Sequence, residues 1–359
     1  MQRAAQPDQF GQERGSGSAE VGVAASGIGH GVSSRVGPAI LTVFGSRATP
    51  GPPGGNRRID GEFRVNRLLC LSYGHQDGPM PAFTAPDGTE LAYHLVGEGE
   101  PVLVLPGGPM RASAYLGDLG GLASRRQLVM LDLRGTGGSG IPADPATYRV
   151  DRQVADVEAF RDHLDLDRVD VLAHSAGGDL AILHAARHPR RVRTLTLITA
   201  RARALGVDFT EEHRREAAAL RRAEPWFEAA HDAYEAVWAG SATDADWDAI
   251  APFFYGRWDT AAQAHAAADA EQSNYGAADV YASPDAFAPA ATREAVAALD
   301  ARVLVLAGEL DSGPLPRVAA TVAGLFPKAE LAVQPGAGHF PWLDDPVRFS
   351  GTVETFLRG

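Results

Sequence analysis

Three side chains, far apart along the chain, have the types and surroundings that nucleophilic catalysis needs. Ser175 lies in the stretch VLAHSAGG, with small residues two positions before it and two positions after it. A serine hydroxyl is a good nucleophile only when a histidine takes its proton and a carboxylate orients that histidine. Asp311 follows the apolar run RVLVLAG, and His339 lies in the glycine-lined loop GAGHFPW after the next run. The chain order Ser, Asp, His is that of a candidate catalytic triad.

Each member of this triad has an alternative. Ser175 could be an ordinary small residue where a strand gives way to a helix. His174 is a second candidate base, but adjacent residues on a tight turn point apart, so we expect His339 to reach the serine. Glu309 is a second candidate acid. It lies two positions before Asp311, and its side chain could point to the opposite face. We favour Asp311 over Glu309.

Attack by a serine on an acyl group also needs two backbone N–H groups that face the developing negative charge. One is expected from Ala176, directly after the serine. The second is expected from the loop PGGPM at 106–110, because glycine lets the backbone approach a ligand closely. Gly108 is our first choice for this donor, and Gly107 is the alternative.

Short apolar runs alternate with helical patterns from residue 101 onward. The runs are rich in Val and Leu, which is typical of strands that are covered on both faces of a parallel sheet. They span 101–108, 127–135, 169–175, 192–200, 302–309 and 330–336. Helices are predicted at 154–164, 178–187, 317–325 and 346–357. The alternation predicts an α/β fold, a mostly parallel sheet flanked by helices.

The chain divides into three parts by composition. Residues 1–79 are rich in Gly, Ser, Pro, Gln and Arg without a sustained period, and we expect them to be disordered. The folded chain is expected to start at Met80, with two strands joined by a turn at residues 87–88. The α/β core is expected to comprise 80–200 and 302–359, and 201–301 to be a helical insertion that covers the carboxyl ends of the strands as a lid.

Composition excludes several classes of protein. The formal net charge of −12 argues against a nucleic-acid partner, because a phosphate backbone requires a basic surface. No apolar run approaches the roughly 18 residues of a membrane span. No secretory signal is present at the amino terminus, which predicts a cytoplasmic protein.

Cys70 is the single cysteine and cannot form an internal disulfide. No metal-ligand spacing or dinucleotide fingerprint is present, so no metal or cofactor is expected; oligomeric state has no sequence signal.

These motifs resemble the α/β-hydrolase superfamily and, within it, the proline iminopeptidase-like branch, over residues 80–359. PGGPM stands where the branch has His-Gly-Gly-Pro-Gly, and DLRGTGGSG stands where it has Asp-Gln-Arg-Gly; AHSAG, GELD and GAGH are its other motifs. The resemblance implies an α/β-hydrolase fold and a loop supported by Asp132 and Arg134. The roles that it implies for the site are nucleophile, acid, base and two oxyanion donors, carried by Ser175, Asp311, His339, Gly108 and Ala176.

The resemblance also implies an activity and a substrate class. A proline iminopeptidase-type aminopeptidase would release a small amino-terminal residue from a small molecule or short peptide through an acyl-enzyme. Carboxylesterase or amidase action on a small acyl substrate, and a non-catalytic binding protein of the same fold, are the alternatives. In the branch's peptidases, lid glutamates bind the substrate's amino group, and Glu271 is the candidate here.

Two further features bear on the resemblance. Pro106, Met110 and Ala176 replace the branch's histidine, last glycine and tryptophan. Between residues 208 and 285 there are sixteen Asp or Glu and five Arg, which would attract an amine-bearing substrate. Solvated helix faces are the alternative explanation of this charge.

Overall fold

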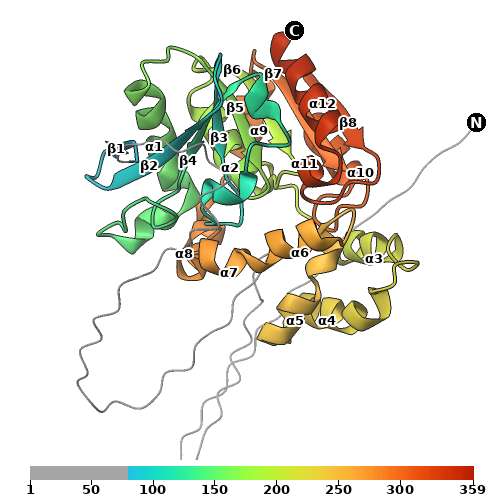
Figure 1. Ribbon diagram of the computed structural model, residues 1–359. Coiled ribbons are helices and arrows are strands. Elements are labelled where there is room, and N and C mark those ends of the chain that lie inside the picture. The colour runs from blue at the N-terminus through green and yellow to red at the C-terminus, as the bar shows by residue number, and fades with distance from the viewer. Residues whose placement is uncertain (1–79) are drawn as a thin grey trace, which may run out of the picture. The chain divides into compact units, whose positions relative to one another are not determined.

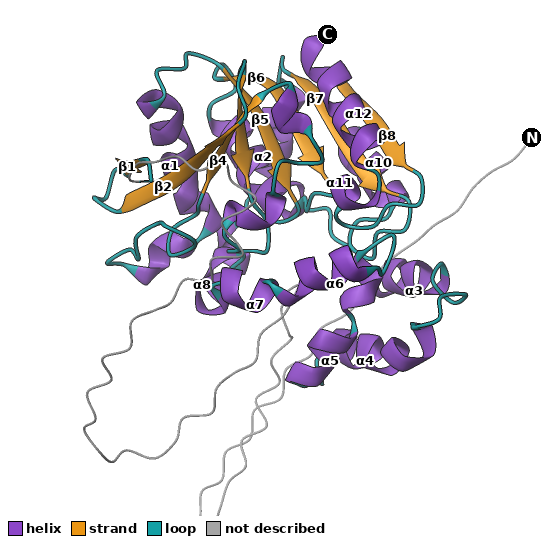
Figure 2. Ribbon diagram, in the orientation of Figure 1, coloured by secondary structure: helices purple, strands orange, loops and turns teal. Residues whose placement is uncertain are grey.

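The part of the chain that the computed structural model describes, residues 80–359, contains one eight-stranded sheet with helices on both faces (Figures 1 and 2). The strand order is β1-β2-β4-β3-β5-β6-β7-β8; β1 and β2 are antiparallel to their neighbours, and the other strands are parallel. The bounds are β1 Ala82–Thr84, β2 Glu90–Val96, β3 Pro101–Leu105, β4 Gln127–Leu131, β5 Val169–His174, β6 Val192–Ile198, β7 Arg302–Gly308 and β8 Ala329–Gln334. The mostly parallel sheet is as predicted. The predictions for residues 1–79 lie outside the described residues.

The hairpin of β1 and β2 contains the predicted turn. Gly88 has a φ of 88°, a conformation that favours glycine, and the Asp87 carboxylate accepts a hydrogen bond from the Thr89 N–H at 3.1 Å. The local sequence therefore determines where the two strands reverse direction.

The strand side chains alternate between two apolar clusters. In β3, Leu103 and Leu105 pack into the cluster on one face, and Val102 and Val104 pack into the cluster on the other. All four are fully buried, as expected for a strand covered on both faces. The first cluster is completed by α1 Val150–His163, α2 Gly177–Arg187, α9 Pro289–Ala297 and α10 Pro316–Ala323, and the second by α12 Pro346–Arg358.

Two strand predictions require correction. The strand predicted at 127–135 ends at Leu131, because the Asp132 carboxylate turns inward and accepts hydrogen bonds from the Ser113 and Gly138 N–H groups at 2.8 and 3.0 Å. The last strand, β8, is not covered on both faces. It lies at the edge of the sheet, where Leu331 and Val333 remain 40% and 41% exposed.

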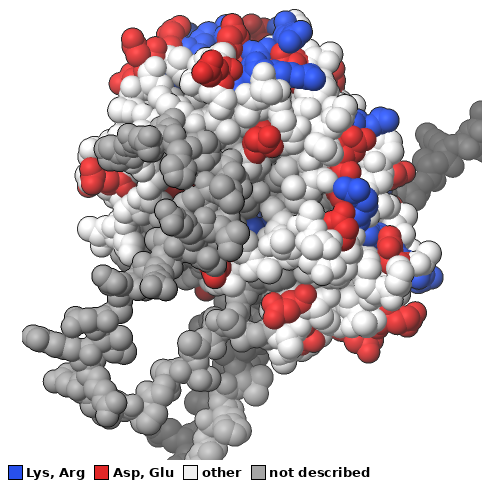
Figure 3. Space-filling model, in the orientation of Figure 1, with Lys and Arg blue, Asp and Glu red and all other residues white. Residues whose placement is uncertain are grey.

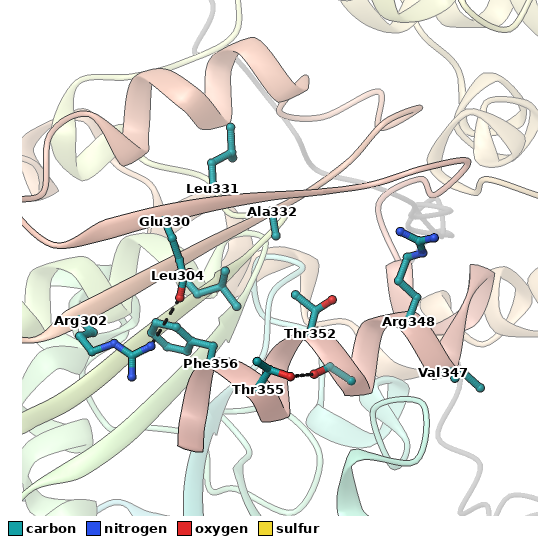
Figure 4. A pocket seen from close by; sticks show the side chains of 11 residues that line it. Arg302, Leu304, Glu330, Leu331, Ala332, Val347, Arg348, Thr352, Thr355 and Phe356 are labelled. Atoms are coloured by element: carbon teal, nitrogen blue, oxygen red, sulfur yellow. Dashed lines mark hydrogen bonds and ion pairs between the residues drawn. The ribbon is translucent and has the colours of Figure 1, made fainter. Parts of the chain in front are cut away.

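A groove of about 560 Å³ lies between β8 and α12 (Figure 4). The Arg302 side chain forms an ion pair with Glu330 at 3.6 Å, and its guanidinium lies 4.6 Å from the centre of the Phe356 ring. Arg302 and Glu330 stand at the amino ends of β7 and β8, whereas Ser175 follows the carboxyl end of the parallel strand β5. The Arg302–Glu330 end of the groove therefore lies at the opposite end of the strands from the candidate nucleophile.

The segment between β6 and β7 is helical. Most of its helices lie near the carboxyl ends of the strands, whereas its last helix, α9, packs on one face of the sheet (Figure 1). Two of the contacts that join the segment to the core lie beside Ser175 and His339: the His339 N–H donates to the Phe254 carbonyl at 2.8 Å, and the Tyr281 hydroxyl donates to the Ala176 carbonyl at 3.1 Å. Its helices before α9 are α3 Glu211–Ala219, α4 Phe227–Ala239, α5 Asp244–Ala249, α6 Thr260–Ala267, α7 Asp269–Gln272 and α8 Tyr275–Tyr281.

Among residues 80–359, no helix has the length and apolar character needed to cross a membrane.

Candidate active site

Ser175 lies on a sharp turn between β5 and α2. Its φ of 51° is in the left-handed region, which a non-glycine residue adopts only when its surroundings impose it. Gly177 is required beside this turn, since a Cβ there would lie 2.5 Å from the Pro106 carbonyl oxygen. Ala173, two positions before the serine, is fully buried, so its methyl group is accommodated where the motif usually has glycine. The turn presents the Ser175 side chain at the carboxyl end of the sheet.

The structure brings Ser175, His339 and Asp311 together. The Nε2 atom of His339 lies 2.8 Å from the Ser175 hydroxyl oxygen. The Nδ1 atom of His339 lies 3.0 Å from each carboxylate oxygen of Asp311. All three residues are buried, and Asp311 is fully enclosed. A carboxylate on Nδ1 places the ring proton there, which leaves Nε2 free to accept the serine proton.

The two candidate acids have different surroundings. Asp311 also accepts a hydrogen bond from the Gly313 N–H at 2.7 Å, which holds its carboxylate toward the imidazole. Glu309 is exposed, and its carboxylate accepts from the Gly336 N–H at 2.8 Å. The structure therefore brings Asp311, and not Glu309, to His339.

His174 lies under the site and does not compete for the serine. The Tyr115 hydroxyl accepts a hydrogen bond from the Gly107 N–H at 2.7 Å, so it donates to Nδ1 of His174, also at 2.7 Å. The Nε2–H of His174 then donates to the backbone carbonyl of His339 at 2.9 Å. Burial, with a contribution from nearby His339, holds the pKa of His174 well below its usual value. His174 is therefore a neutral ring that holds the loop carrying His339, and Tyr115 had no distinguishing signal in the sequence.

The two N–H groups expected to face an oxyanion lie on both sides of the elbow. Gly107 packs directly on it, because a Cβ at Gly107 would be 2.8 Å from the Ser175 Cβ. The Gly107 N–H is bonded to Tyr115, so Gly107 is the less suitable of the two loop donors. The N–H groups of Gly108 and Ala176 have no hydrogen-bond acceptor within residues 80–359.

The motif residues Asp132 and Arg134 fasten neighbouring segments. Asp132 accepts from Ser113 and Gly138 as described above and pairs with His94 at 3.0 Å. The buried Arg134 guanidinium donates to both carboxylate oxygens of Asp156, each at 2.5 Å, and it also pairs with Asp87. Asp132 and Arg134 therefore hold neighbouring parts of the fold together and do not contact Ser175 or His339.

The helical segment contributes a buried acid that the sequence did not single out. Glu271 lies exposed near the end of α7. Asp269, at the start of the same helix, is buried and forms an ion pair with Arg111 at 3.0 Å. Burial raises the pKa of Asp269, and Arg111 opposes this shift. Arg111 and Asp269 are separated by more than 150 positions, so no sequence spacing indicated the pair.

No group of His, Cys, Asp and Glu side chains in residues 80–359 is arranged to hold a metal ion.

Comparison with known proteins gives matches in sequence and in fold. A proline iminopeptidase from Lactobacillus helveticus is 37% identical over 128 residues, which cover 34% of this chain and 42% of the relative. A proline iminopeptidase from Heyndrickxia coagulans is 37% identical over 99 residues, covering 28% and 34%. A cis-3-alkyl-4-alkyloxetan-2-one decarboxylase from Shewanella oneidensis is 30% identical over 118 residues, covering 32% and 37%. The chain thus matches less than half the length of these curated relatives.

Two solved structures share the fold at low sequence identity. An esterase from Rhodococcus sp. ECU1013 is 24% identical with a TM-score of 0.60, and the match covers 78% of this chain and 98% of that one. An esterase from Exiguobacterium antarcticum is 20% identical with a TM-score of 0.60, covering 78% and 100%. The family model for the alpha/beta hydrolase fold matches residues 100–346 of this chain. The chain therefore belongs to the alpha/beta hydrolase fold family, and the matching part of its sequence is similar to the proline iminopeptidases.

Proposed function

We propose that the protein is a serine hydrolase that works through an acyl-enzyme, with Ser175 as nucleophile, His339 as base and Asp311 as the acid that orients the base. The observation that carries this proposal is the 2.8 Å distance between the Ser175 hydroxyl oxygen and Nε2 of His339. Hydrogen-bond reach between nucleophile and base is the first geometric requirement of this chemistry.

The proposed reaction has two half-reactions that return the enzyme to its starting state. As the Ser175 oxygen attacks the acyl carbon, Nε2 of His339 takes the hydroxyl proton. The bond to the leaving group then breaks, and His339 passes that proton to the departing oxygen or nitrogen. Water attacks the acyl-enzyme, gives one proton to His339 and releases the acid, and the proton returns to Ser175. Asp311 stabilises the imidazolium in both half-reactions.

The proposed oxyanion donors are the N–H groups of Gly108 and Ala176. Neither group has an acceptor in the part of the chain that the structure describes, which supports this role, since an oxyanion donor must be free before the substrate binds. The Ala176 N–H also lies at the amino end of α2, where the helix dipole favours negative charge. We therefore prefer Gly108 to Gly107 as the loop donor.

The preferred substrate class is that of a proline iminopeptidase-type aminopeptidase, which the curated relatives support. The acidic helical segment is compatible with an amine-bearing substrate, and acidic side chains lie on its surface with basic ones between them (lower right in Figure 3). This segment is proposed to act as the lid, because it contacts His339 and Ala176 through Phe254 and Tyr281.

A second substrate class is favoured by the placement of two acids. The Asp269 carboxylate is already paired with Arg111, and Glu271 is exposed. Neither observation supports a free carboxylate that would bind a substrate's amino group. A small ester or amide without such a group is therefore the alternative, as for a carboxylesterase or amidase.

Labelling with a fluorophosphonate probe tests the proposed nucleophile. The native chain should be labelled and should hydrolyse at least one substrate of a panel, and Ser175→Ala should do neither. Proline p-nitroanilide and p-nitrophenyl acetate, compared at equal enzyme concentration, separate the two substrate classes. A native chain that takes no label would instead support a non-catalytic binding protein.

A further inference from the structure

We propose that Arg111 is a positioning residue through which the helical segment holds the loop carrying the Gly108 N–H. The inference rests on the proposed function, because it assigns a partner to one of its oxyanion donors. On this inference, α6 and α7 help to position a group that stabilises the transition state, in addition to any role in substrate selection.

Backbone hydrogen bonds join the loop to the helical segment on both sides of Arg111. The Asn274 N–H donates to the Met110 carbonyl at 2.9 Å, and the Ala112 N–H donates to the Gln272 carbonyl at 2.8 Å. Arg111 itself forms an antiparallel bridge with Ser273. Residues 110–112 therefore pair with 272–274 as a very short ladder.

The Arg111 side chain extends the same junction deeper into the molecule. It is 4% exposed. Its Nη1 pairs with Asp269 at 3.0 Å, and its Nε and Nη2 donate to the Gln272 side-chain oxygen at 2.9 and 2.7 Å. Nη2 also donates to the His265 carbonyl at 3.1 Å. Three hydrogen bonds and one ion pair of the guanidinium thus bind the helical segment, which favours an anchoring role over a substrate-binding one.

Arg111 also touches the residues next to the oxyanion donor. Its guanidinium lies 4.6 Å from the centre of the Tyr115 ring, and the Tyr115 hydroxyl accepts a hydrogen bond from the Gly107 N–H. Its own backbone N–H donates to the Gly107 carbonyl at 3.1 Å. Arg111 therefore connects the helical segment to Gly107, the residue before Gly108, through Tyr115 at its N–H and directly at its carbonyl.

The loop needs such an anchor because its backbone conformation is unfavourable by itself. Met110 has a φ of 62°, and Gly108 has a φ of 115°. A methionine in the left-handed region persists only where surrounding contacts over-determine it. Met110 is fully buried, and its carbonyl is held by Asn274. Without Arg111, we expect the loop to relax and the Gly108 N–H to leave its place.

The test compares Arg111→Lys and Arg111→Met with a matched buried ion pair elsewhere. Arg126 is similarly buried and donates to Glu354 at 2.8 Å, so Arg126→Lys is the control. With p-nitrophenyl acetate as the probe, Arg111→Met should lower kcat by about 100-fold, the size expected when a reacting group is misplaced by about 1 Å. Arg111→Lys should lie between Arg111→Met and the native chain. KM should change by less than about threefold, because the donor acts mainly in the transition state.

The control defines what a purely structural role would look like. Arg126→Lys should lower the thermal unfolding midpoint and leave kcat per folded molecule within about twofold of the native value. If the Arg111 variants behave in this way too, or if KM rises while kcat holds, the inference is wrong. If they do not fold, Asp269→Asn, which keeps the shape of the side chain and removes its charge, carries the same test, and an unchanged kcat then counts against the inference.

Failure of the inference can be told apart from failure of the proposed function. Loss of turnover and label in Ser175→Ala, together with unchanged kcat in the Arg111 variants, overturns the role of Arg111 alone. Turnover that survives in Ser175→Ala overturns the proposed function, and the inference about Arg111 with it.

Discussion

The Nε2–H of His174 donates to the backbone carbonyl of His339, so the residue before the candidate nucleophile holds the loop of the candidate base. The same carbonyl also accepts from the Thr199 hydroxyl at 2.9 Å. Two side chains from β5 and the end of β6 thus converge on one backbone oxygen. The position of the base therefore depends on residues that take no part in proton transfer.

His174→Phe should weaken both folding and turnover. Phenylalanine keeps the ring in the buried site but leaves the Tyr115 hydroxyl and the His339 carbonyl each without one hydrogen bond. Loss of a buried partner costs about 1–3 kcal/mol in the free energy of unfolding. Urea denaturation measures this loss, and kcat should fall because His339 is less firmly placed. An unaltered kcat would mean that Thr199 alone suffices to hold the loop.

Asp311→Asn should reduce kcat by about four orders of magnitude while the protein remains folded. The amide N–H₂ can donate to Nδ1 of His339, which favours the tautomer that cannot take the serine proton. Glu309→Gln is the matched control and should leave kcat nearly unchanged, because the Glu309 carboxylate binds the Gly336 N–H and does not reach His339. Steady-state kinetics on both variants decides between the two acids, and a large loss in the control would reverse the assignment.

The buried His184 should make the protein less stable in mild acid. Burial lowers the pKa of His184 to about 4, against the opposing hydrogen bond from its Nε2–H to Glu158. Between pH 6.5 and about 4 the unfolded chain binds more protons than the folded one, so the free energy of unfolding falls as the pH falls. At pH 5, the titration of His184 alone lowers the free energy of unfolding by about 2 kcal/mol relative to neutral pH.

Replacing this histidine tests the expected slope. His184→Gln keeps a donor toward Glu158 and removes the titration, so its stability should fall less between pH 7 and pH 5 than that of the native chain. His231→Gln, at a much more exposed histidine, is the control and should keep the native slope. Denaturation midpoints at several pH values provide the comparison, and parallel curves for all three proteins would contradict the prediction.

Gly177→Ala should destabilise the turn at Ser175. The added Cβ would lie 2.5 Å from the Pro106 carbonyl oxygen, and both segments are backbone that cannot move aside cheaply. We expect a loss of about 1–3 kcal/mol in the free energy of unfolding, together with lower activity. Gly351→Ala in α12, where a Cβ meets nothing within 4 Å, should be neutral or slightly stabilising. Thermal unfolding of both variants checks the contrast.

The sequence alone was sufficient for features that depend on neighbours along the chain. Alternating apolar runs predicted the parallel sheet because burial on both faces leaves a local pattern, and Asp87-Gly88 predicted the hairpin because glycine permits a positive φ. The small residues around Ser175 predicted the tight turn for a similar reason. The end of β4 and the exposure of β8 were missed, because they depend on where Asp132 bonds and on which strand lies at the edge.

Tertiary structure decided the choices between near neighbours and the pairs that are distant in sequence. Asp311 and Glu309 are two positions apart, and only the packing of the loop after β7 turns one toward His339 and the other toward Gly336. Arg111 and Asp269 meet because the helical segment folds back onto the chain that follows the 106–110 loop. Local sequence restricts backbone conformation, but the direction of a buried side chain is set by what packs against it, and those partners come from distant parts of the chain.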